Sequence, residues 1–321
     1  MALPPEARAA LDLADDREPD LAQAVNAMLG SWRDGWPLTK LRALLASYPG
    51  TAADALDPSR PAHGTILKAS DQDPLYRVLL SIISTAAEIP MDAGFRVVNP
   101  HAARYARQQA ARLVTEVDNA TRRAIRDIVR RGIEGELTVD QQARLLRDTI
   151  GLHPRQATAV SNLRTRLEAG TAANVEGVVT REGMTAAQID RTVEAYARRQ
   201  LALRAQVIAH HETMLAANRG LLAGWQSTDM IPEGAWIEWL VNPDESLCPE
   251  CESIAEDVAE NGAASSVTEG PRGARGVNGG TFSSDLGEYE TPPAHVGCRC
   301  TLTLHLSEDE PAVGPDTVVT V

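Results

Sequence analysis

The sequence predicts a mainly α-helical protein, in which helical N-terminal and central regions with one long helix precede a small α+β module that carries the cysteines. Three observations support this prediction. Apolar residues recur at helical spacing in the middle of the chain, capping signals open several helices, and all four cysteines lie in two short pieces near the C-terminal end. We divide the chain into residues 1–99, 100–230, 231–306 and 307–321.

The composition is that of a globular protein with a buried core. Of its 321 residues, 43% are hydrophobic and only 4% are aromatic, which favours helices packed through Ala, Leu, Ile and Val. The net charge of −13 argues against general coating of nucleic acid, because affinity for phosphates requires clustered Lys and Arg. The N-terminus lacks a signal-peptide core, and the most apolar stretch, from Leu75, is too short to span a bilayer. We therefore expect synthesis in a cytoplasm and no membrane partner.

Residues 1–99 contain helix-like patches without recognisable chemistry, so we predict a helical region of unassigned role. From about His101 the helical signal strengthens, because alternating spacings of three and four residues connect Ala106, Ala110, Leu113, Val117, Ala120, Ala124 and Ile128. Arginines lie outside this stripe, and Arg122, Arg126 and Arg130 are the candidate surface for DNA. Interleaved acidic residues favour a solvated face over a DNA-binding one.

Two helices after this stripe are bounded by local signals. Thr138 and Gln141 stand in capping-box register, and the segment that they open ends at Gly151. The next segment has Pro154 in its first turn and Gly170 at its end. These signals predict a helical hairpin.

A second capping box, Thr185 with Gln188, opens a long helix that we expect to continue to Gly220 or Gly224. The sequence "AWIEWLVNPDES" follows, and its aromatic and β-branched residues predict a strand that ends in a turn just before Cys248. Residues 307–321 are acidic and contain Pro and Gly, which predicts an extended tail.

The cysteines form two ligand pairs of equal spacing. Two residues separate Cys248 from Cys251, and two separate His295 from Cys298, so each pair can hold one metal ion from a tight turn. Together they predict a closed, tetrahedral, structural zinc site of the zinc-knuckle kind over residues 231–306. Cys300 is the surplus candidate and could replace His295 as the fourth ligand. Reduced cysteines without metal, and disulfides, are the remaining interpretations.

A catalytic alternative uses the His-x-Glu of His210 and Glu212 with Cys248 and Cys251, as in zinc-dependent nucleobase deaminases. Against it, His210 and Glu212 fall inside a long amphipathic helix, and Leu247 stands where those enzymes place a proline. The interpretation also leaves the second cysteine pair unexplained. Other catalytic signatures are absent from the sequence, so we predict that the protein is not an enzyme.

The order of these features is similar to that of a known family. The C-terminal pattern Pro-Pro-x-His-x-x-Cys-Arg-Cys is carried by Pro292, Pro293, His295, Cys298, Arg299 and Cys300. On the long helix, Glu212, Asn218 and Gly220 match the family's polar signature. Over roughly residues 100–306, the chain resembles the phage Mu protein F-like family of minor head, or head morphogenesis, proteins.

This resemblance implies a structural role in a virion. Members of the family enter the head of a tailed phage during assembly, near the portal vertex, and are linked to DNA packaging or ejection. The resemblance therefore implies a minor capsid protein, with the portal protein or the major capsid protein as partner. Contact with packaged DNA through Arg122, Arg126 and Arg130 would be secondary, and a DNA-binding accessory protein is the alternative.

Overall fold

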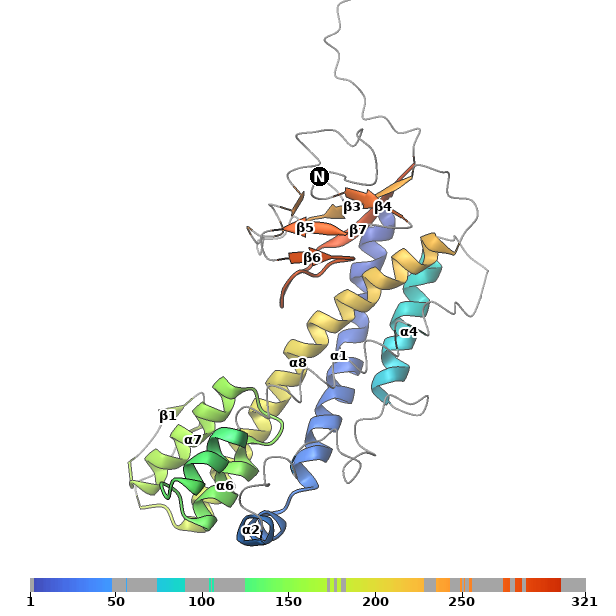
Figure 1. The fold of residues 1–321 in the computed structure, drawn as a ribbon. Helices are drawn as coiled ribbons and strands as arrows, with labels where there is room; N and C mark the ends of the chain where they lie inside the picture. The colour runs from blue at the N-terminus through green and yellow to red at the C-terminus, as the bar shows by residue number, and fades with distance from the viewer. Residues whose placement is uncertain are drawn as a thin grey trace, which may run out of the picture. The chain divides into compact units, whose positions relative to one another are not determined.

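The structure is a computed structural model (Figure 1). It describes residues 3–47, 56, 74–89, 104, 106, 125–171, 174–175, 178–179, 183–227, 235–242, 249, 251, 254–255, 274–277, 281–284 and 287–306. Cys248, Arg122 and the predicted tail at 307–321 lie outside these residues. The predictions made for them stay predictions.

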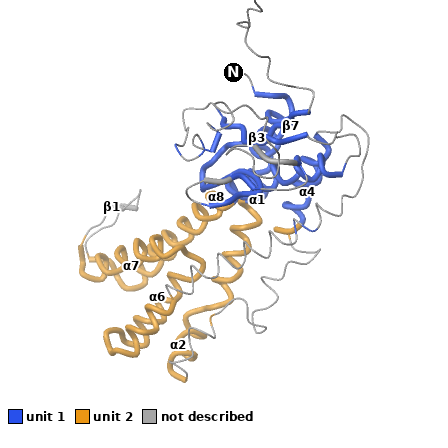
Figure 2. Tube along the Cα trace, turned by 45° about the horizontal axis from the view of Figure 1, so that its top comes forward, with its two compact units in different colours: residues 1–21, 77–107, 209–321 blue, residues 22–76, 108–208 orange. Residues whose placement is uncertain are grey.

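The chain divides into two compact units, each assembled from separate stretches of sequence (Figure 2). Unit 1 consists of Met1–Leu21, Arg77–Arg107 and Ala209–Val321. Unit 2 consists of Ala22–Tyr76 and Gln108–Ile208. Helices α1 (Pro5–Asp34) and α8 (Ala186–Gln226) each contribute to both units. The units therefore cut across our linear division, because the first residues of the chain share a unit with the cysteine module.

Unit 2 is helical, and its helices begin where the sequence predicts. Helix α6 (Val139–Thr149) starts at a complete capping box of Thr138 and Gln141, and α7 (Pro154–Glu168) has Pro in its first turn. After them, Gly151 and Gly170 adopt φ angles of 84° and 73°, the left-handed region that favours glycine. The predicted hairpin is therefore present.

The core of unit 2 is built from helices that are distant in sequence. Helix α2 (Leu38–Ser47) packs on α6, and residues 125–133 are helical within the predicted stripe. Their buried side chains form one cluster with the C-terminal end of α1, and it comprises Trp32, Trp36, Leu41, Leu45, Leu56, Ile125, Ile128, Val129, Ala143, Leu145, Leu146 and Ile150. The antiparallel pair β1 (Asn174–Val175) and β2 (Val178–Val179) precedes α8.

A buried ion pair connects α6 to α7 in the same unit. Arg164 Nε lies 2.7 Å from Asp148 Oδ2, and the two side chains are 6% and 4% exposed. Arg33, whose side chain is fully buried, lies 3.9 Å from the same Asp148. Removal of one partner from a buried ion pair lowers the free energy of unfolding, because the other charge is left uncompensated. The carboxylate of Asp148 therefore stabilises the packing of three helices.

Unit 1 contains the C-terminal sheet, whose strand order is β4-β3-β7. Strand β3 (Trp236–Leu240) pairs antiparallel with β4 (Ala274–Gly276) and with β7 (Thr301–His305), placing Trp236 opposite His305. The rings of that pair stack with centroids 3.9 Å apart. A second antiparallel pair, β5 (Phe282–Ser284) with β6 (Gly287–Tyr289), packs on Trp239 through Phe282 and Tyr289.

Helix α8 ends at Gln226 and passes through both glycines at which we expected it to stop. Both glycines face α4 (Pro74–Glu88) at close range. A Cβ atom at Gly220 would lie 2.3 Å from Ala86 Cβ and 2.5 Å from the Ile83 carbonyl oxygen. A Cβ atom at Gly224 would lie 2.5 Å from the Ala87 carbonyl oxygen. The glycines therefore allow close approach of two helices.

The architecture confirms the predicted fold class, which is mainly helical with one long helix and a small module of α and β elements at the C-terminal end. The predicted strand before the first cysteine is β3, and the second capping box, Thr185 with Gln188, forms at the start of α8. Within the residues that the structure describes, no helix is long and apolar enough to cross a membrane.

Candidate metal centre

Three buried cysteines meet in unit 1. The Sγ atoms of Cys251, Cys298 and Cys300 all lie within 4.8 Å of one another, and the residues are 2%, 3% and 4% exposed. Cys251 is helical, as are residues 249, 254 and 255, whereas Cys298 and Cys300 immediately precede β7. Cysteines 47 residues apart are thus brought together. They lie close enough to bind a metal ion.

The distances in the cluster suit coordination of a metal. Cys251 Sγ lies 3.4 Å from Cys298 Sγ and 3.3 Å from His295 Nε2. Ligand atoms around a tetrahedral zinc, with Zn–S bonds of about 2.3 Å, are about 3.5–3.8 Å apart. A disulfide would require sulfurs about 2.0 Å apart. All three cysteines are free thiols in this structure.

His295 presents its Nε2 atom to the cluster. Its Nδ1 lies 3.0 Å from the carbonyl oxygen of Val296. Because a carbonyl oxygen only accepts hydrogen bonds, Nδ1 is the donor and Nε2 carries the lone pair. That lone pair is directed at Cys251, which is the arrangement that metal-binding histidines adopt when their second nitrogen is held by a backbone carbonyl.

The thiols of the cluster shift one another's pKa. Hydrogen bonds from Cys251 and then from Cys300 lower the pKa of Cys298. The same contact with Cys298 raises the pKa of Cys251, and contact with Cys300 and burial raise it further. Without a cation, burial and mutual repulsion oppose a second thiolate. A divalent ion would remove this opposition, because metal ligands bind as thiolates.

The pKa of Cys300 is raised to about 12, because the contributions that raise it outweigh those that lower it. Its hydrogen bond with Cys251 lowers this pKa, whereas the hydrogen bond with Cys298 and burial raise it, and the indole N–H of Trp239 lowers it. Trp239 Nε1 is itself buried and has no partner within hydrogen-bond geometry among the residues that the structure describes. A buried donor near a thiol is satisfied when that thiol becomes a thiolate. This indole nitrogen and the donor set both fit a metal-bound thiolate.

Helix α8 supports the cluster through a buried amide. Asn218 is fully buried, and its Nδ2 donates to the carbonyl oxygen of Cys300 at 3.1 Å and to that of Met214 at 3.0 Å. The first bond holds the backbone of one candidate ligand, and the second fixes the amide to its own helix. Sequence reasoning found Asn218 through the family's signature but assigned it no contact.

The structure brings three of the five predicted ligands into one group and places His295 beside one of them. Cys300, which we treated as surplus, belongs to the group with Cys251 and Cys298, and His295 contacts that group through Cys251. Cys248 lies outside the described residues. The buried Trp239 has no functional signal in the sequence, and Arg299 belongs to the family pattern, but that pattern does not predict its partner, Asp15 of α1.

The deaminase residues are not brought to these cysteines. In the part of the chain that the structure describes, the group of potential metal ligands around Cys251 does not include His210 or Glu212. His210 Nδ1 instead lies 2.8 Å from Glu18 Oε2 on α1, and Glu212 is 4% exposed within α8. These residues therefore contribute to helix packing in unit 1.

The arginine-rich face is partly neutralised. Arg130 pairs with Asp127 and Glu134 on its own helical segment, and these contacts raise its pKa. Any phosphate bound by Arg130 would compete with these two carboxylates. Arg126 is exposed. Within the described part of this face, the charge pattern is that of a solvated helix surface.

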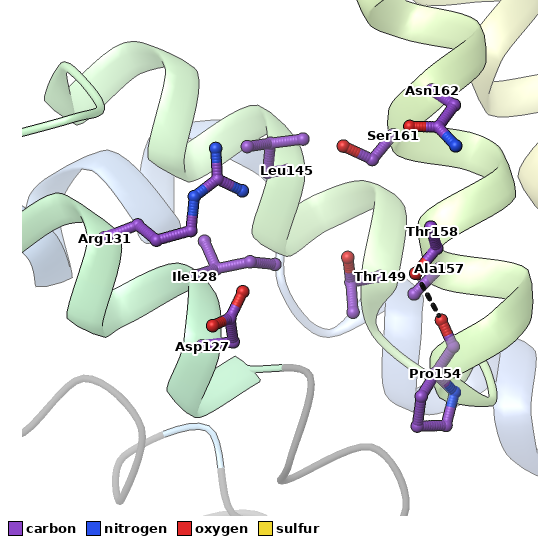
Figure 3. A pocket seen from close by; sticks show the side chains of 10 residues that line it. All are labelled: Asp127, Ile128, Arg131, Leu145, Thr149, Pro154, Ala157, Thr158, Ser161 and Asn162. Atoms are coloured by element: carbon purple, nitrogen blue, oxygen red, sulfur yellow. Dashed lines mark hydrogen bonds between the residues drawn. The ribbon is translucent and has the colours of Figure 1, made fainter.

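Unit 2 also holds a pocket of about 430 Å³ (Figure 3). Ile128, Leu145 and Ala157 give it an apolar part, and the hydroxyl groups of Thr149 and Ser161 lie among the labelled side chains. Its volume is that of a small-molecule site. The pocket belongs to unit 2, whereas the cysteine cluster belongs to unit 1.

Comparisons of the chain with known proteins found no relative. No family model, no curated protein and no solved structure matches the chain. Function therefore has to be argued from the residues and their geometry.

Proposed function

We propose that the protein is a minor capsid or head morphogenesis protein of a tailed phage, located in the head near the portal vertex. Its role is structural: it assists head assembly and the packaging or ejection of DNA. The observation that carries the proposal is the C-terminal motif in which His295, Cys298, Arg299 and Cys300 stand in the order of the Mu protein F-like family. Burial of both motif cysteines beside Cys251 supports a structural use of the motif.

We further propose that the bound metal is zinc and that it closes the C-terminal module. Three thiolates and one imidazole make a complete tetrahedral ligand set, which leaves no position for a reactive water. Cys251, Cys298 and Cys300 are three of these ligands, and His295 is the fourth. Small modules with little core of their own gain stability from such a site, because metal binding and folding are linked.

The fourth ligand is tested by substitution and metal analysis of the purified full-length chain. The H295A variant should lose zinc or bind it far more weakly, whereas C248S should retain one zinc ion per chain. The reverse result would assign the fourth position to Cys248. Cobalt substitution adds a direct reading, because the charge-transfer absorption of the cobalt form reports the number of thiolates.

The location in the head is tested with intact phage particles. Cross-linking mass spectrometry of purified heads should connect this chain to the portal protein, or to the major capsid protein next to it. Absence of the chain from DNA-filled heads would overturn the location. Binding to DNA is the subordinate role, and it predicts affinity that falls with salt and with neutralisation of Arg122, Arg126 and Arg130.

We propose no enzymatic activity for this site. A deaminase would need zinc with an open position and a nearby Glu as proton shuttle. The contact of His210 with Glu18 favours a packing role for that histidine. Retention of zinc in an H210A variant is the expected result, and loss of zinc together with loss of a deaminase activity would reverse the assignment.

A further inference from the structure

The segment just before β7, which carries Cys298 and Cys300, also contacts α1. Between Cys298 and Cys300, the guanidinium of Arg299 binds the carboxylate of Asp15 through two hydrogen bonds of 2.8 Å each. Three residues beyond Cys300, within β7, the hydroxyl of Thr303 donates to Glu6 Oε1 at 3.2 Å. Asp15 and Glu6 both lie in the part of α1 that belongs to unit 1.

The Arg299 contact has the geometry of a strong ion pair. Both guanidinium nitrogens reach separate carboxylate oxygens, which is the bidentate form that holds arginine in one orientation. Arg299 is 28% exposed and Asp15 is 51% exposed. The hydrogen bond from Arg299 is the main cause that lowers the pKa of Asp15, so the carboxylate is charged when it makes the contact.

The other side of this segment is held by α8. Asn218 donates to the carbonyl oxygen of Cys300, and the amide is fully buried. Three consecutive residues are therefore attached to three different parts of unit 1. The side chains of Cys298 and Cys300 belong to the thiol cluster, and the side chain of Arg299 binds α1. The backbone carbonyl of Cys300 is bound by α8. Successive side chains in an extended segment point to opposite sides, so one backbone orientation must satisfy all three.

We infer that Arg299 and Asn218 are positioning residues of the metal site, and that Arg299 couples metal binding to the docking of α1 residues 5–21. This inference rests on the metal site of the proposed function but not on the location in a phage head. A metal ion bound by Cys298 and Cys300 fixes the backbone between them, and this presents Arg299 to Asp15 in its paired orientation. Metal binding would thereby stabilise the contact between Arg299 and α1 residues 5–21, and we call this coupling the latch.

Thermodynamic coupling is reciprocal, which makes the latch testable. If metal binding strengthens the docking of α1, then removal of the α1 contact must weaken metal binding by the same factor. For a partly exposed ion pair the factor is about 2- to 5-fold. For Asn218, which holds a ligand's backbone, it is about 10-fold, as is typical of residues that support metal ligands. Arg299 and Asn218 are not among the candidate metal ligands, so a purely structural role in helix packing would leave zinc affinity unchanged.

The experiment measures the zinc dissociation constant of the folded full-length chain by competition with a chromophoric chelator. The variants are Asp15→Asn, Arg299→Gln and Asn218→Ala, and the control is Asp127→Asn, which removes an acid of 55% exposure from an ion pair in unit 2. The first two should raise the dissociation constant about 2- to 5-fold and to the same extent. Asn218→Ala should raise it about 10-fold, and the control should leave it unchanged.

Three further tests accompany this measurement, and the first of them needs no stable metal-free chain. The rate at which excess chelator removes zinc from the loaded chain should rise in the same order. Hydrogen exchange of a peptide covering residues 5–20 should increase on zinc removal, whereas exchange across α7 should not. The charge exchange Asp15→Arg with Arg299→Asp should restore zinc affinity relative to either single change.

The outcomes separate this inference from the proposed function. Two outcomes would overturn the latch and leave the metal site intact. One is equal zinc affinity in the wild type, Asp15→Asn and Arg299→Gln. The other is a rate of hydrogen exchange at residues 5–20 that does not change when zinc is removed. A wild-type chain that binds no zinc would overturn both the metal site and the latch. Neither result bears on presence in phage heads, which cross-linking tests independently.

Discussion

Substitution of Gly220 by alanine tests the close packing of α8 on α4. The added Cβ atom would lie 2.3 Å from Ala86 Cβ and 2.5 Å from the Ile83 carbonyl oxygen. Carbon atoms pack best at about 3.5 Å or more, so the helices would have to separate by about 1.2 Å. Neither obstacle is the flexible end of a side chain. One is a methyl group fixed to the backbone and the other is the backbone of α4 itself.

The magnitude follows from two opposing contributions. Alanine is favoured over glycine in a helix interior by about 1 kcal/mol, whereas overpacking of a well-packed contact costs about 1–3 kcal/mol. The clash is with two rigid groups, so we take the upper part of that range and expect Gly220→Ala to destabilise the protein by about 1–2 kcal/mol.

A matched control is available in α1. Gly30 also lies in a helix interior, but a Cβ atom there would meet nothing within 4 Å. Gly30→Ala should therefore stabilise the protein by about 0.5–1 kcal/mol. Urea denaturation followed by circular dichroism measures both variants. If Gly220→Ala were as stable as the wild type or as Gly30→Ala, the inferred helix contact would be wrong.

Three further outcomes follow from unit 2. Asp148→Ala leaves Arg164 and Arg33 buried without this carboxylate and should cost about 3–5 kcal/mol in urea denaturation, with Asp127→Asn as an exposed control within about 0.5 kcal/mol of the wild type. Thr138→Ala removes a capping box and should cost about 1 kcal/mol by the same assay, and an unchanged midpoint would contradict the cap. Burial opposes the ionisation of Glu194, but its arginine partners, chiefly Arg33, lower its pKa below the ordinary value of 4.5. Its contribution to stability is therefore present above about pH 4.5 and lost as pH falls. A Glu194→Gln variant should show a shallower decline of melting temperature between pH 5 and pH 3 than the wild type, and parallel curves would contradict the assignment.

The sequence by itself determines the elements whose physics is local. The capping boxes of Thr138 and Thr185 form because each side chain satisfies backbone groups within the same turn. The strand at Trp236–Leu240 follows from its aromatic and β-branched residues. Paired spacing identified the cysteines, since two ligands on one tight turn are also a local arrangement.

Only the tertiary structure decides which distant groups meet. The sequence predicts a helix end at Gly220, whereas its position opposite Ala86 on α4 shows that a glycine is needed there for close helix packing inside α8. The partner of Arg299 lies 284 residues away at Asp15, and that of Cys300's carbonyl lies 82 residues away at Asn218. Such pairings depend on how helices from both ends of the chain pack around one core, which no spacing rule encodes. For the same reason, Cys300 enters the cluster because β7 begins just after it, at a position set by its pairing with β3.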